Sequence, residues 1–351
     1  MSEDVERPME LSDLLDGLRA RRVAALARAI SLVENRAPGF EDLLSELHPL
    51  VGRGRRVGIT GPPGAGKSTL VERLVQHHRT AGRTVGVVAV DPTSPFSGGA
   101  LLGDRIRMEA VSLDPGVYIR SMATRGSLGG LAMTTAEVCD VLDAFGFDRI
   151  LIETVGVGQS ELDVVRAADS TLVVLVPESG DGIQTLKSGL MEIADVFVVN
   201  KADRTGADRL RREIEVALGL RRGQAFRHVP AHHGHAGQGS ARDGPEARAG
   251  WEPPVLLTVA VRGEGIEPLV GALEGHYAWL EASGMLEVRR RARLLERTRA
   301  VTERAMREWL WRDARADEAI EGRLTAVADG AISPYRAARE IVEHLRTGAA
   351  R

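Results

Sequence analysis

The sequence has little cysteine, lysine or asparagine and no long apolar run, and each shortage limits what the protein can be. The single cysteine, Cys139, excludes an internal disulfide and a metal site built from several cysteines of one chain. Apolar runs such as LVVLV at 172–176 are far too short to span a bilayer. The acidic start MSEDVERPMELSD lacks the basic-then-apolar order of a signal peptide. We therefore expect a cytoplasmic protein with no membrane segment.

The balance of charge excludes another class of protein. Lysine and arginine total 46 against 49 acidic residues, which gives a formal charge of −3. Electrostatics therefore offer no case for a nucleic-acid binder. Hydrophobic residues make up 43% of the 351 residues, enough for a sizeable core, and the length fits about two domains.

Short runs rich in valine and isoleucine alternate with stretches of helical periodicity from residue 55 onward. This alternation is typical of βαβ units, in which helices cover both faces of a mostly parallel sheet. It predicts an α/β fold, with further helices at 11–35, 40–50 and 286–351. The predicted strands are 55–60, 84–91, 117–122, 149–153, 171–176, 196–200 and 256–261. The predicted helices between them lie near 67–80, 103–113, 133–145, 161–168, 183–193, 206–218 and 265–283.

The segment GPPGAGKS at 61–68 fits the phosphate-binding pattern G-x-x-x-x-G-K-[ST] and lies between a predicted strand and a predicted helix. Its glycines would let backbone N–H groups face phosphates, Lys67 would neutralise phosphate charge, and the Ser68 hydroxyl would bind Mg²⁺. The alternative is an ordinary glycine-rich turn. The predicted loop comprises Gly61, Pro62, Pro63, Gly64, Ala65, Gly66, Lys67, Ser68 and Thr69.

The tetrad NKAD at 200–203 follows an apolar run and fits the guanine-recognition pattern N-K-x-D. The Asp203 carboxylate can accept hydrogen bonds from guanine N1–H and its amino group, whereas adenine would leave that carboxylate unpaired. Asn200 would bind the N7/O6 edge, and the Lys201 side chain would lie over the ring. A third contact to the base is predicted from the backbone near Ala260. The sequence has only three lysines in an arginine-rich background, and Lys67 and Lys201 both lie in these motifs.

Acidic residues at predicted strand ends are candidates for Mg²⁺ binding and catalysis. In RILIETVGVGQSE, Glu153 ends a strand and Gly156 could offer its N–H to the γ-phosphate. Gln159 could orient the attacking water, or could simply belong to a loop. Asp91 also ends a strand, and Asp104 follows a glycine-rich turn, where it could equally be a helix N-cap.

Longer stretches resemble the MeaB/ArgK family of P-loop GTPases, called MMAA in animals. The resemblance lies in GITGPPGAGKSTL, VDPTSPFSGGALLGDRIRM, IRSMATRGSLGGLA, ILIETVGVGQSE, VVNKAD and GAISPYRAA, and it covers about residues 15–345 except 221–250. It implies a P-loop NTPase fold, a Mg²⁺-dependent GTPase, and a chaperone that gates adenosylcobalamin loading of methylmalonyl-CoA mutase or a close acyl-CoA mutase.

The resemblance also implies roles for particular segments. Ser68, Asp91, Asp104 and Glu153 fall where the family holds Mg²⁺ and its switches. The segment 177–189, with Lys187, resembles a further switch that contacts the mutase. A homodimer held by C-terminal helices is implied as well. The expected organisation is a helical extension at 1–50, a GTPase domain at 51–284 with a flexible insertion at 221–254, and a helical dimerisation arm at 285–351.

Two other functions remain open. The insertion contains His228, His232, His233 and His235, and histidine-containing tracts can bind Ni²⁺ or Zn²⁺. A nickel-delivery GTPase is therefore the alternative hypothesis, although a flexible linker explains the same residues. A small-molecule kinase is the other, and the NKAD motif argues against its use of ATP.

Overall fold

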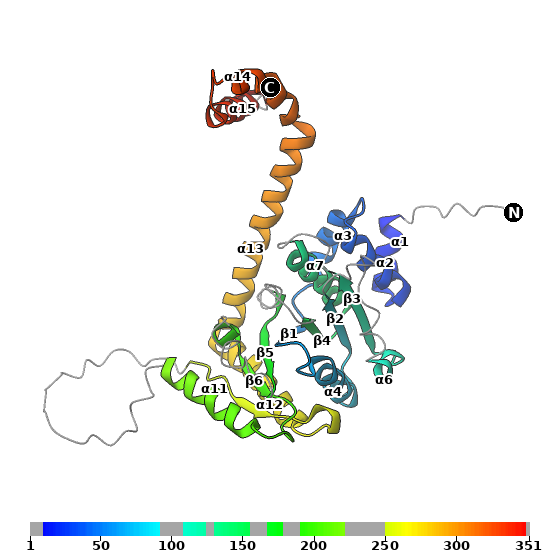
Figure 1. Ribbon diagram of the computed structural model, residues 1–351. Helices are drawn as coiled ribbons and strands as arrows, with labels where there is room; N and C mark the ends of the chain where they lie inside the picture. Colours follow the sequence, from blue (N-terminus) through cyan, green and yellow to red (C-terminus); the bar gives the residue numbers. More distant parts are fainter. Residues whose placement is uncertain are drawn as a thin grey trace, which may run out of the picture. The chain divides into compact units, whose positions relative to one another are not determined.

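Seven parallel strands form one sheet in the order β3–β2–β4–β1–β5–β6–β7 (Figure 1). The computed structural model describes residues 10–91, 108–123, 130–154, 167–177, 190–221 and 250–348. The strands are β1 (Arg55–Thr60), β2 (Val85–Asp91), β3 (Val117–Ala123), β4 (Arg149–Thr154), β5 (Ser170–Leu175), β6 (Val196–Val199) and β7 (Val255–Leu257). The predicted α/β fold with a parallel central sheet is confirmed.

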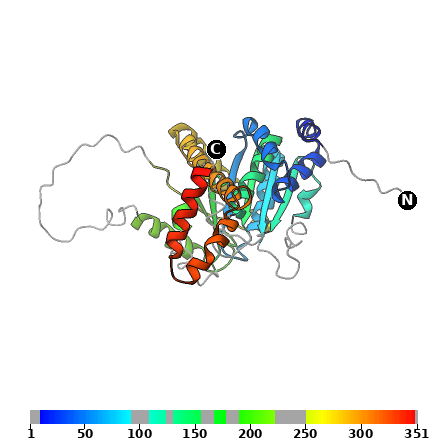
Figure 2. The same cartoon turned by 90° about the horizontal axis from the view of Figure 1, so that it is seen from above.

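The central strands are buried along their whole length because helices cover both faces of the sheet (Figure 2). Side chains alternate between the faces, so that in β4 Ile150 and Ile152 join one core and Leu151 joins the other. The first core contains the three N-terminal helices and the helix before β4. The second contains the helix that follows the predicted phosphate-binding loop at 61–69, called the phosphate loop below, and the long helix after β7. The helices between residues 11 and 47 thus complete the core of the sheet domain.

The helices of this domain have the following bounds. They are α1 (Leu11–Arg19), α2 (Val23–Glu34), α3 (Phe40–Leu47), α4 (Lys67–Thr80), α6 (Glu109–Ser112), α7 (Gly130–Phe145), α10 (Met191–Ile193), α11 (Ala207–Arg221) and α12 (Ile266–Ser283). Short 3₁₀ turns are η1 (His48–Leu50) and η3 (Ala260–Arg262). None of the helices described is both long enough and apolar enough to cross a bilayer.

One predicted strand is longer than the structure allows. The run 256–261 was expected to be a strand, but β7 ends at Leu257 and the chain turns into η3. Gly263 and Gly265 both have positive φ, and Val259 forms an isolated bridge with Glu264 that closes the turn. Val259 and Ala260 of this run are buried, Ala260 in the second core, whereas Val261 is exposed.

The chain divides into two compact units, Met1–Arg289 and Arg290–Arg351. The helix α13 (Met285–Glu308) begins in the first unit and continues into the second. The second unit also holds the π-helical turn η4 (Trp309–Asp313) and the helices α14 (Ala316–Ala328) and α15 (Pro334–Gly348), which pack on each other (Figure 1). The helical prediction for 286–351 agrees with these elements, and the predicted domain boundaries stay a prediction.

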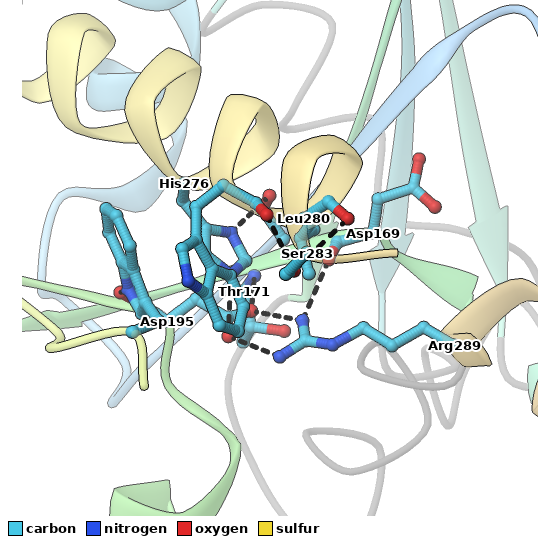
Figure 3. Close-up of polar contacts among 10 residues, drawn as sticks. Asp169, Thr171, Asp195, His276, Leu280, Ser283 and Arg289 are labelled. Carbon is cyan, nitrogen blue, oxygen red and sulfur yellow. Dashed lines mark hydrogen bonds and ion pairs between the residues drawn. The ribbon is translucent and has the colours of Figure 1, made fainter. Parts of the chain in front are cut away.

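A buried carboxylate holds several segments together at the amino ends of β5 and β6 (Figure 3). Asp195 accepts the Thr171 N–H at 2.9 Å and two guanidinium contacts from Arg289, at 2.9 and 3.0 Å. Arg289 also donates to the Asp169 carbonyl at 3.0 Å. The Trp251 indole donates to the Asp195 carbonyl at 2.7 Å. The carboxylate therefore joins the sheet to the start of α13.

The same cluster contains a serine, a histidine and an aspartate in a row. Ser170 Oγ lies 2.8 Å from His276 Nδ1, and His276 Nε2 lies 3.2 Å from Asp195 Oδ1. His276 is fully buried and stacks on Trp279. A nucleophilic triad needs a hydroxyl that a substrate can reach, whereas Ser170 is only 2% exposed. The row is a structural element of the core.

Candidate nucleotide site

The carboxyl ends of neighbouring strands bring the predicted motifs to one edge of the sheet. β1 leads into the GPPGAGKS segment, and in the adjacent β4 Glu153 lies beside Ile59 of β1 in the register. β6 ends just before Asn200. In open parallel sheets, ligands bind outside this edge. The chain topology therefore unites segments that are 140 residues apart, between 60 and 200.

The loop after β1 requires its glycines. Gly61, Gly64 and Gly66 have φ of +140°, +73° and +84°. A Cβ on Gly61 would lie 2.0 Å from the Val174 carbonyl oxygen, and one on Gly66 would lie 2.5 Å from Asn200 Nδ2. Both contacts are closer than atoms can approach, so a side chain at either position would force the loop or its neighbours to move. The backbone of the loop can therefore pack against β5 and against the end of β6.

The Lys67 side chain folds back over this loop. Its Nζ donates to the carbonyl oxygens of Gly61 at 2.7 Å and of Pro62 at 3.0 Å, and the residue is 5% exposed. Lys67 is also the first residue of α4, whose N-terminal N–H groups and dipole favour an anion. The arrangement places an ammonium and a helix N-terminus together at the loop, as phosphate binding requires.

A hydroxyl and a carboxylate meet beside the loop. Ser68 Oγ donates to Glu153 Oε1 at 2.6 Å, and Glu153 is 1% exposed. These are two of the four residues for which the sequence predicts Mg²⁺ binding; the other two are Asp91 and Asp104. Both offer oxygen atoms, the donor type that Mg²⁺ prefers, so the pair fits that ion. The hydrogen bond places the Ser68 hydroxyl, in the first turn of α4, beside the Glu153 carboxylate near the end of β4.

Several predicted site residues are not among those that the structure describes in full. Asp91 ends β2 at the same edge of the sheet, but its side chain is not described. Asp104, Gly156 and Gln159 lie outside the described residues, as do 178–189 and the insertion at 222–249. Their roles in Mg²⁺ binding, catalysis and partner contact stay predictions.

Asn200 connects the phosphate loop to the turn after β7. Its Nδ2 donates to the Ala65 carbonyl at 2.8 Å, while its Oδ1 accepts the Thr258 hydroxyl and the Ala260 N–H, both at 3.1 Å. The residue is 2% exposed. The sequence predicts that Asn200 binds the guanine edge and that the backbone near Ala260 contacts the base. In this structure those two groups bind each other, which gives Asn200 a structural role that its motif alone did not reveal.

Lys201, Ala202 and Asp203 complete the NKAD motif, and the last two contact the segment after β7. Lys201 adopts φ +56°, and the Ala202 N–H donates to the Thr258 carbonyl at 3.0 Å. The Asp203 carboxylate forms an ion pair with Arg262 at 2.9 Å, and its side chain is 42% exposed. Sequence reasoning missed Arg262. No local signal marks it, because its role depends on the turn that places η3 beside Asp203.

Comparisons with known proteins agree on one family. The profile of the family "Methylmalonyl Co-A mutase-associated GTPase MeaB" matches residues 26–315. A protein of Pyrococcus abyssi named as a GTPase is 44% identical over 96% of this chain and 98% of its own length. The GTPase ArgK of Escherichia coli is 34% identical over 96% of this chain and 97% of its own length.

A mammalian relative and a solved structure extend the comparison. The methylmalonic aciduria type A homolog of mouse mitochondria is 36% identical over 79% of this chain and 65% of its own length. A crystal structure described as a LAO/AO transport system kinase is 28% identical, with a TM-score of 0.66 over 97% of this chain and all of that chain. The similarity thus covers both the sheet domain and most of the helical C-terminal region.

Proposed function

Because this chain belongs to the MeaB family of GTPases, we propose that its GTP hydrolysis gates adenosylcobalamin loading of an acyl-CoA mutase, with methylmalonyl-CoA mutase as the client. The observation that carries the proposal is the match of residues 26–315 to a family described as mutase-associated. The mouse relative, whose name refers to methylmalonic aciduria, supports the same client. A chaperone of this kind needs a nucleotide site and a partner surface, and no cobalamin site of its own.

The phosphate half of the proposed site uses residues at the start of α4. The amides of the loop and the Lys67 ammonium would surround the β- and γ-phosphates, where they stabilise the charge of the transferring group. Ser68 and Glu153 would hold Mg²⁺, which neutralises phosphate charge when bound. Water attacks the γ-phosphorus in line, the bond to the bridging oxygen breaks, and GDP and phosphate leave.

The base half of the proposed site uses the segment after β6. The Asp203 carboxylate would accept guanine N1–H and its amino group, in place of part of its contact with Arg262. Asn200 would hold the phosphate loop and the turn after β7 in register. A site built around an acceptor of this kind disfavours adenine, because the carboxylate would lose its partners.

The energy of hydrolysis would be used to switch conformation. The nucleotide orders loops near the γ-phosphate, and these loops bias the conformation of a bound partner. We expect slow turnover by the chain alone and faster turnover on the mutase. Arg105, Arg107 and Arg125, which are candidates for recruitment by a partner, lie outside the described residues.

The C-terminal unit supports the further proposal of a homodimer. Apolar side chains of this unit are exposed on several helices, and a second copy of the chain is the partner that we propose for them. A second copy of the chain would cover them through α13, α14 and α15. The exposed residues are Leu294, Leu295, Met306, Trp311, Ile320, Leu324, Tyr335 and Val342.

The test is GTP turnover by the purified chain with and without each cobalamin-dependent acyl-CoA mutase of the same genome. ATP serves as the control nucleotide, and a Lys67→Ala variant as the control protein. Acceleration that is specific to GTP and to one mutase would support the proposal and identify the client. Turnover that no such mutase changes would contradict the chaperone function and favour the metal-delivery alternative.

A further inference from the structure

A side chain of the phosphate-loop helix holds the turn on the base side of the site. Arg73 lies on α4, six residues after Lys67. Its Nε donates to the Ala260 carbonyl at 2.9 Å, and its Nη2 donates to the Val261 carbonyl at 2.8 Å. The remaining Nη1 donates to Gln76 Oε1 at 3.0 Å, one turn further along the same helix. All three nitrogens of the guanidinium are thereby used.

The turn that Arg73 binds carries the groups that face the proposed base site. The N–H of Ala260 donates to Asn200 Oδ1 at 3.1 Å. Two residues later, Arg262 forms its ion pair with the Asp203 carboxylate. Residues 260–262 are a single 3₁₀ turn, so a displacement of its carbonyls also displaces Asn200 and Arg262.

The contacts with Arg73 add a second connection between the two halves of the site. The first runs from Ala65 of the phosphate loop through Asn200 to Ala260. The second runs along α4 from the loop to Arg73 and from there to the carbonyls of the same turn. Arg73 thus holds the turn at the carbonyls of Ala260 and Val261, whereas Asn200 holds it at the Ala260 N–H.

We propose that Arg73 is a positioning residue for guanine recognition, which fixes the turn at 260–262 relative to the phosphate loop. The inference rests on the GTP site proposed above and adds a residue that none of its motifs contains. Arginine suits the position because its planar guanidinium presents fixed donors to two adjacent carbonyls. A lysine has one ammonium group and cannot reproduce that geometry. In this role Arg73 acts through its hydrogen bonds to the turn and not through a contact of its own with the nucleotide.

The variants Arg73→Gln and Arg73→Lys test this role in the full-length chain. A matched control is Arg79→Gln on the same helix, because Arg79 pairs with Asp114 at 2.9 Å and donates to the Arg83 carbonyl, away from the turn. Two ligands are compared in each variant. GDP uses both halves of the site, whereas inorganic tripolyphosphate uses only the phosphate half. The same preparations give kcat and KM for GTP.

The proposal predicts a selective loss. Arg73→Gln should weaken GDP binding about ten-fold, which corresponds to about 1.4 kcal/mol. It should also raise KM for GTP, with kcat and tripolyphosphate affinity within about two-fold of wild type. Arg73→Lys should lie between wild type and Arg73→Gln, and Arg79→Gln should match wild type.

Several results would overturn the role of Arg73. One is an unchanged GDP affinity in Arg73→Gln. Another is an equal loss of GDP and tripolyphosphate binding, since that would mean that Arg73 merely supports α4. A loss in Arg79→Gln as large as in Arg73→Gln would point to the helix in general. None of these outcomes affects the GTP site itself, which fails only if the wild-type chain does not bind guanine nucleotides.

Discussion

Replacement of Asn200 by alanine should damage stability and nucleotide binding together. The side chain makes three hydrogen bonds, to the Ala65 carbonyl, the Thr258 hydroxyl and the Ala260 N–H. Because Asn200 is 2% exposed, water does not easily replace it. The alanine variant loses all three bonds at once and leaves a donor and an acceptor of the backbone without these partners.

The size of the effect follows from these contacts. A buried hydrogen bond contributes about 0.5–1.5 kcal/mol net, so three of them give about 1.5–4.5 kcal/mol. We expect a loss near the middle of this range. Nucleotide affinity should fall as well, since Asn200 fixes the distance between the phosphate loop and the turn that faces Asp203.

The assay is urea unfolding followed by circular dichroism, combined with titration of GDP. The chain has only one other asparagine, and it provides the control. Asn35 is exposed at the end of α2, where its amide donates to the Ser31 carbonyl at 2.9 Å. Asn35→Ala should change the unfolding free energy by less than about 0.5 kcal/mol and leave GDP affinity unchanged.

The reasoning would be refuted by an Asn200→Ala variant that behaves like Asn35→Ala. It would also be refuted by a variant that loses stability but binds GDP as tightly as wild type. The first result would mean that the three hydrogen bonds add nothing net. The second would separate the Asn200 contacts from the nucleotide site.

Three further predictions concern other parts of the sheet domain. Gly61→Ala must move the loop away from the Val174 carbonyl oxygen. We therefore expect a loss of GDP binding and a decrease of about 1–3 kcal/mol in the free energy of unfolding, measured by urea unfolding. Asp143→Ala removes a buried partner of Arg56, 3.0 Å away, and should lower the unfolding free energy by about 3–5 kcal/mol. Burial alone would raise the pKa of Asp195, but its contacts with His276 and Arg289 outweigh this and lower the pKa below 3.8. The resulting stabilisation is complete at neutral pH and is lost as the pH falls through that lowered value. Urea unfolding between pH 2 and 7 should therefore show a smaller acid loss for Asp195→Asn than for wild type, and equal losses would contradict the assignment.

The sheet could be predicted from the sequence because its central strands β4 and β5 are buried on both faces. Such strands appear as short apolar runs, and α4 begins at Lys67 as the phosphate-loop motif predicts. The exception is the end of the run 256–261, which forms η3. Its conformation depends on Asn200 and Arg73, which lie far away in the sequence, and no local pattern contains that information.

The candidate site was predictable only in part for the same reason. Spacing was enough to select Ser68 and Glu153, since both motifs specify a strand end or a loop position. It did not reveal that Asn200 binds the loop and the turn, because those partners come from two other segments. Arg73 and Arg262 could not be predicted because the sequence contains many arginines and no motif singles out these two.

The most direct test of the account is the nucleotide preference of Asp203→Asn. The central claim is that the Asp203 carboxylate recognises guanine at the carboxyl edge of the sheet. An amide in its place presents a donor where guanine also presents a donor, whereas xanthine presents a carbonyl oxygen there. We predict that the variant binds GDP at least about ten-fold more weakly than wild type and binds xanthosine diphosphate more tightly. A variant that keeps the wild-type preference for GDP over xanthosine diphosphate would contradict the claim.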